Sequence, residues 1–223
     1  MPKVATEKRS EKKSGWGNGQ LFGSEKNENT FQGGGFKDKE KALETLRLLE
    51  GKDVTYQYQI VNSMYNRAKV ILKRTTDKEK RANLSEAIDT FENFIDDYKK
   101  NQRQKENFGY ISLEVMEGCR PLAEKYGLKD FEFLEAYKEE DGDLKKLRSK
   151  KIPGKDLTWD VERNKRLKEI SEKIKNELIP LYETDDPFKG LPSREHVEMI
   201  MLSYSGDQSK VKKCIPLISE KFK

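Results

Sequence analysis

The stretch from Asp53 to Lys100 reads DVTYQYQIVNSMYNRAKVILKRTTDKEKRANLSEAIDTFENFIDDYKK and determines the architecture of the chain. Its apolar side chains form two series spaced by four and three residues, and residues at these spacings share one face of a helix. The first series is Val54, Tyr58, Val61, Tyr65, Ala68 and Leu72. The second series is Leu84, Ile88, Phe91, Ile95 and Tyr98. We therefore predict two amphipathic helices whose stripes, including Phe91, face a common core.

A short polar segment separates the two predicted helices. Thr76-Asp77-Lys78-Glu79 has the spacing of a capping box, so we expect Thr76 to cap the second helix. Lys73 and Arg74 suit the negative end of the first helix dipole. Because a connection of a few residues favours antiparallel neighbours, the stretch predicts a central antiparallel helical hairpin.

The rest of the chain continues the helical pattern. Further helices are expected at about 38–50, from Phe108 until Pro121 ends or kinks it, at 131–137, at 158–182, at 197–204 and beyond Gly206. The expected helix at 158–182 places Leu178 and Leu181 on its inward face. No segment alternates convincingly like a strand, so the predicted fold is all-α, an irregular multi-helix bundle. We assign residues 37–223 to one helical domain, with a sub-boundary near 150–157, where Pro153-Gly154 breaks the pattern.

Residues 1–36 differ from the rest in composition. They contain many glycines and lysines and few aliphatic residues, which predicts a disordered tail. Isolated apolar residues in such a tail can dock into a partner's groove, and the candidates for this role are Trp16, Leu21 and Phe22. Alternatively, Phe31 and Phe36 pack onto the folded domain.

Composition restricts the class of protein. Hydrophobic residues make up 34% and charged residues 38% of the 223 residues, against about 45–50% and about 25% in average domains. This balance suits helices with a large solvated surface more than a compact enzyme. The two cysteines, Cys119 and Cys214, are far apart and form no zinc-binding pattern. The N-terminus has no apolar core of a secretion signal and no segment is a membrane span, so we expect an intracellular protein.

Signatures of catalysis are weak. The single histidine, His196, lies in Ser193-Arg194-Glu195-His196 near a helix start, and a histidine there can be a base or a surface residue. No nucleophile elbow, Walker loop, dinucleotide fingerprint or zinc-protease motif accompanies it. We therefore expect no catalytic residue, no cofactor, no metal ion and no small-molecule substrate. An enzyme with His196 in a cleft is a third hypothesis, and the sequence supports it less than an adaptor protein or a nucleic-acid-binding protein.

The strongest local signal is the segment KKLRSKKIPGK at 145–155, which has six basic residues and no acid. Such a run can bind a nuclear-import receptor, a phosphate backbone or lipid headgroups, or it can be a solvated helix end. The candidate binding residues are Lys145, Lys146, Arg148, Lys150, Lys151 and Lys155.

These observations favour a non-enzymatic helical interaction or adaptor protein that binds a protein partner in an intracellular complex. The basic run favours the nucleus, alone or with the cytoplasm, as its location. The alternative is an accessory protein that binds nucleic acid through the basic surface around 145–168. No interaction with a membrane is expected.

Overall fold

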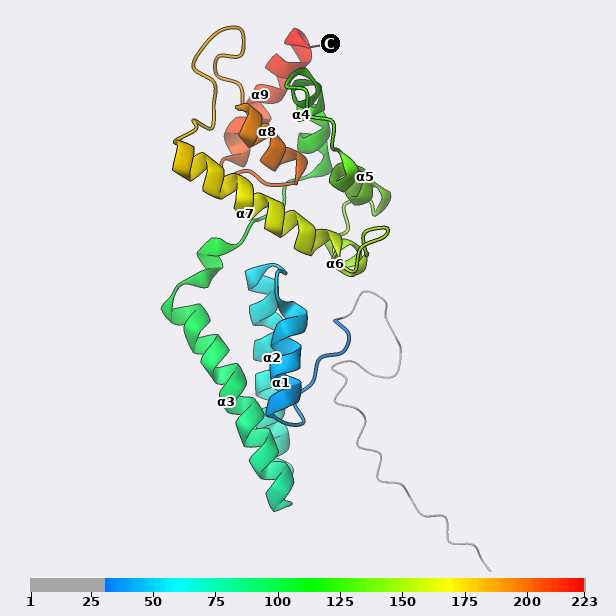
Figure 1. The fold of residues 1–223 in the computed structure, drawn as a ribbon, viewed down its shortest axis with the longest axis vertical. Coiled ribbons are helices and arrows are strands. Elements are labelled where there is room, and N and C mark those ends of the chain that lie inside the picture. Colours follow the sequence, from blue (N-terminus) through cyan, green and yellow to red (C-terminus); the bar gives the residue numbers. More distant parts are fainter. Residues whose placement is uncertain (1–30, 223) are drawn as a thin grey trace, which may run out of the picture.

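The computed structural model describes residues 31–222, which form nine α-helices, one 3-10 helix and no strands. Figure 1 shows α1–α3 grouped at one end and α4–α9 at the other. We call these groups the N-terminal unit, residues 31–100, and the C-terminal unit, residues 108–222. The prediction of an all-α fold is confirmed. Residues 1–30, which make up most of the expected tail and include Trp16, Leu21 and Phe22, lie outside the described residues.

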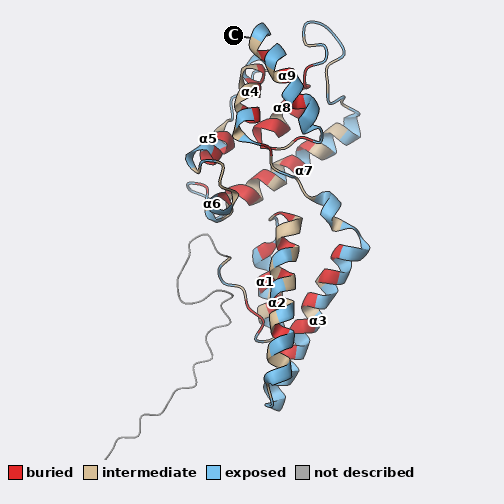
Figure 2. Cartoon of the chain, turned by 180° about the vertical axis from the view of Figure 1, so that it is seen from behind, coloured by how far each residue is buried: buried red, intermediate tan, exposed pale blue. Residues whose placement is uncertain are grey.

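The N-terminal unit is built on the predicted hairpin. It contains α1 (Lys39–Leu49), α2 (Val54–Arg74) and α3 (Lys78–Lys100), and α2 and α3 lie antiparallel (Figure 1). All five apolar residues of the second series are buried, and Phe91 is fully buried. Burying a side chain of this size contributes about 1.5–3 kcal/mol. Figure 2 shows buried segments, in red, along α1, α2 and α3.

The start of α3 corrects the expected capping box. Asp77, not Thr76, is the N-cap, and its carboxylate accepts a hydrogen bond from the Lys80 amide at 3.0 Å. Aspartate and threonine are both good caps, and sequence spacing alone does not decide between neighbouring ones.

The folded part of the chain begins earlier than residue 37. Phe36 is 4% exposed and belongs to the core of the N-terminal unit, and Phe31 packs against that core. The Thr45 hydroxyl donates to the Gly35 carbonyl and accepts from the Gly35 amide. Residues 31–36 are therefore part of the unit, as the alternative reading of Phe31 and Phe36 expected.

The C-terminal unit has a separate core. Its helices are α4 (Leu113–Lys125), α5 (Glu132–Glu139), α6 (Leu144–Ser149), α7 (Trp159–Glu177), α8 (Arg194–Met201) and α9 (Gln208–Lys221). Helix α4 packs against α8 and α9. Leu147, Ile152 and Trp159, which span the sub-boundary expected near 150–157, belong to one apolar cluster. The two apolar clusters are separated between Ile95 and Ile111, where the linker contains the 3-10 helix η1 (Arg103–Glu106).

Helix α4 begins later in the chain than predicted, and it does not end at Pro121. It begins at Leu113 rather than Phe108, because the preceding backbone pairs with another segment: the Ile111 amide donates to the Ser203 carbonyl at 3.0 Å. It then continues through Pro121 to Lys125. Proline removes one backbone hydrogen bond, but Leu122 and Ala123 just after it are fully buried, and this packing holds the helix together.

Candidate functional site

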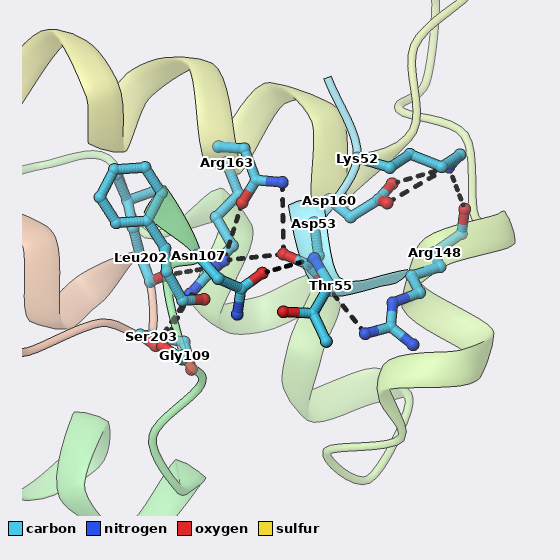
Figure 3. Close-up of polar contacts among 12 residues, drawn as sticks. Lys52, Asp53, Thr55, Asn107, Gly109, Arg148, Asp160, Arg163, Leu202 and Ser203 are labelled. Carbon is cyan, nitrogen blue, oxygen red and sulfur yellow. Dashed lines mark hydrogen bonds and ion pairs between the residues drawn. The ribbon is translucent and has the colours of Figure 1, made fainter. Parts of the chain in front are cut away.

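The two units meet at a polar junction made by the turn between α1 and α2 (Figure 3). Gly51 in this turn has a φ of +77°, and a Cβ there would lie 2.8 Å from Val161 Cγ1 on α7. Glycine is therefore required both for the backbone conformation and for the close approach to α7. The two residues that follow, Lys52 and Asp53, carry the charges of the junction.

Asp53 is the acidic centre of the junction. Its side chain is 4% exposed and accepts a hydrogen bond from Arg148 Nη2 at 3.0 Å and one from Asn164 Nδ2 at 3.3 Å. Arg163 Nη1 lies 3.8 Å away, and the Arg148 guanidinium also covers the Tyr56 ring. Asp53 thus connects the start of α2 to α6 and α7.

Lys52 forms the second ion pair of the junction. Its ammonium lies 3.2 Å from Asp160 Oδ2 and also donates to the Arg148 carbonyl at 3.1 Å. Burial raises the pKa of Asp160 above its ordinary value, while Lys52 and the Thr158 hydroxyl oppose this shift. Lys52 therefore compensates a carboxylate that is otherwise withdrawn from water.

Arg163 is fully buried and fixes the backbone around the linker. Its guanidinium donates to the carbonyls of Leu202 at 2.7 Å, Phe108 and Gly109 at 3.1 Å and Ser203 at 3.2 Å. Each charge of the junction faces an opposite charge or several hydrogen-bond acceptors. This arrangement holds the α1–α2 turn of the N-terminal unit against α6 and α7 of the C-terminal unit.

The predicted basic run does not form one continuous cationic surface. Arg148 points into the junction, and Lys150 contacts Glu139 at 2.6 Å and Glu140 at 2.9 Å. Three further lysines are near acids: Lys146 near Glu140, Lys151 near Asp156 and Lys155 near Glu162. In the described part of the chain, Lys145 is the only one of the six candidates without an ion pair. Local acids therefore neutralise much of the run.

His196 is an interior residue, 1% exposed. Nδ1 lies 2.8 Å from the Leu181 carbonyl and Nε2 lies 2.9 Å from Ser205 Oγ. Burial lowers the pKa of His196, and the hydrogen bond to Leu181 partly opposes this effect. The Ser205 hydroxyl also accepts from the Asp207 amide at 3.1 Å. The histidine links the loop before α8 to the loop after it, and it does not line the cleft described below.

Both cysteines lie in the apolar core of the C-terminal unit. Cys119 and Cys214 are free and buried, and burial raises the pKa of the Cys119 thiol to about 12. Between residues 31 and 222, no group of three or more His, Cys, Asp or Glu side chains is placed to hold a metal ion. Among the helices described, none combines the length and apolarity needed to cross a membrane.

The segment Leu178–Leu181, which we call the elbow, contradicts the predicted inward stripe. Helix α7 ends at Glu177, and Leu178 has a φ of +53° with 86% of its surface exposed. Leu181 is 38% exposed. Pro180 explains the early end, because it lacks an amide donor and disfavours helical backbone at Ile179.

Sequence reasoning missed the elbow as a site, although Pro180 within the predicted helix was a signal for it. The junction had no such signal, because its partners are far apart in the chain. No family model matches the chain, and no curated protein matches it significantly.

Proposed function

We propose that this protein is a non-enzymatic helical adaptor that binds a protein partner through the elbow and acts in an intracellular complex in the nucleus. The observation that carries the proposal is Leu178, a large apolar side chain that is 86% exposed in a left-handed conformation. The left-handed region costs a residue with a Cβ about 1–2 kcal/mol relative to ordinary helical backbone. Glycine or asparagine usually occupies this position after a helix.

Both the strain and the exposure at Leu178 are unfavourable for the chain alone. Strained residues are concentrated at functional positions, and clustered exposed apolar side chains mark interaction sites. Leu181 lies three residues on and adds a second exposed leucine. A partner that covered both would gain about 1.5–3 kcal/mol at Leu178 and less at Leu181, of which only 38% is exposed before binding. The buried, hydrogen-bonded state of His196 and the paired charges of the junction favour an adaptor over an enzyme.

A protein partner is also favoured over nucleic acid by the state of the basic run. Arg148 and Lys150 face acids of the same chain, so fewer free cations remain to contact phosphates. The nuclear location rests on the exposed lysines of the run, which an import receptor would reach.

Affinity capture tests the proposal. Wild-type protein and a Leu178→Ser, Leu181→Ser variant are immobilised and exposed to nuclease-treated lysate of the source cells. The control is Leu48→Ser, Val70→Ser, which alters two exposed apolar residues of the N-terminal unit. We expect a protein that wild type and control retain and the elbow variant loses. Retention of only nuclease-sensitive material, or equal retention by all three, would count against the proposal.

A further inference from the structure

A cleft with a volume of about 270 Å³ opens between α5, α7, α8 and the loop at 127–130. Its apolar base includes Phe133, Met201 and Leu202, each no more than 3% exposed. This volume is slightly below the range of about 300–1,000 Å³ that is typical of small-molecule pockets. The cleft can therefore take one or two side chains of a peptide, and its base is suited to an apolar one.

More basic than acidic side chains line the cleft. Two acidic residues line the cleft, and Arg166 forms an ion pair with each of them. Its Nη1 lies 2.7 Å from Asp130 and its Nη2 lies 3.9 Å from Glu198. Lys129 and Arg194 also line the cleft, are exposed, and have no ion pair within the described part of the chain. Two unpaired cations thus lie around an apolar base.

We propose that this cleft is a second binding site, separate from the elbow, for a peptide segment in which a bulky apolar side chain adjoins carboxylates. The apolar side chain would enter over Phe133 and Met201, while the carboxylates pair with Lys129 and Arg194. Arg166, fixed by its two acids, holds the cleft in shape between α7 and α8. Both kinds of contact are needed, because exposed ion pairs alone contribute only about 0–1 kcal/mol each.

Fluorescence anisotropy with labelled nine-residue peptides tests this site in the full-length protein. The panel carries Leu, Phe or Trp at the centre and Asp or Glu on both sides. We expect saturable binding by at least one member, and a loss of affinity of about tenfold or more in a Lys129→Gln, Arg194→Gln variant. The matched control is Lys212→Gln, Lys213→Gln, which removes two exposed lysines of α9 and should leave the affinity unchanged.

Peptide variants separate the two kinds of contact. Replacing the acids of the best peptide with Asn and Gln should weaken binding as much as the cleft variant does, and replacing its central residue with Ser should abolish binding. The proposal is overturned if no panel member saturates below about 1 mM, if acid-free peptides bind equally well, or if the control loses as much affinity as the cleft variant. The Leu178→Ser, Leu181→Ser variant should bind the peptide panel with the affinity of the wild type. The proposals for this cleft and for the elbow can therefore be tested independently.

Discussion

The ion pair between Asp53 and Arg148 should hold the two units together more strongly than an exposed pair of similar geometry. The perturbation is a double-mutant cycle with Asp53→Asn, Arg148→Gln and both together. Asp53 is 4% exposed and receives two hydrogen bonds, and bonds to charged groups contribute about 1.5–3 kcal/mol each. Since the Arg148 side chain is 24% exposed, solvent screening reduces its share. We expect Asp53→Asn to lower the free energy of unfolding by about 2–4 kcal/mol, and a coupling energy of about 1.5–3 kcal/mol.

The chain offers a matched control in the pair between Arg166 and Asp130. This pair is shorter, at 2.7 Å, but its side chains are 26% and 51% exposed. Exposed pairs of this kind usually contribute about 0.2–1 kcal/mol. Both cycles are measured by urea unfolding, followed by circular dichroism and tryptophan fluorescence. If the Asp53–Arg148 coupling is no larger than that of the control pair, burial does not strengthen the junction and our reasoning about it is wrong.

Three other outcomes follow from the structure. Phe36→Ala should lower stability by about 3–5 kcal/mol in urea unfolding, because the side chain is 4% exposed, and an unchanged midpoint would show that it is not core. Because burial lowers the pKa of His196, its contribution to stability is full above pH ~6.5 and falls as the pH drops below that value. His196→Gln should reduce this acid dependence between about pH 7 and pH 5, and an identical slope would contradict the assignment. Replacing the exposed lysines of the basic run with Gln should change stability by less than about 0.5 kcal/mol but move the protein to the cytoplasm, as fluorescence imaging would show. The lysines changed are Lys145, Lys146, Lys151 and Lys155.

The N-terminal hairpin could be predicted from the sequence because the pattern of apolar residues that determines it lies within each helix. Helical periodicity in α3 places an apolar residue on one face every three or four positions, and burial of that face follows directly. The same reasoning failed at Leu178, where the periodic pattern continued although the helix stopped. Local backbone chemistry at Pro180 prevailed there over the periodicity of the side chains.

The junction could not be predicted from the sequence for a different reason. Asp53 and Arg148 are 95 positions apart, and nothing in the neighbourhood of either residue distinguishes it from a solvated charge. Because five other cations lie close to it in the sequence, the sequence alone places Arg148 in a basic run. Only the packing of the α1–α2 turn against α6 and α7 shows that its partner is inside the protein (Figure 3).

The central claim, that the elbow contacts a protein partner, is tested most directly by photo-crosslinking in living cells. A photoreactive amino acid, p-benzoylphenylalanine, is placed at position 178, and at position 70 as a control on an exposed apolar site of α2. We predict that position 178 captures a protein of defined mass and that position 70 does not. The account is contradicted if position 178 yields no protein adduct, or if both positions capture the same proteins to the same extent.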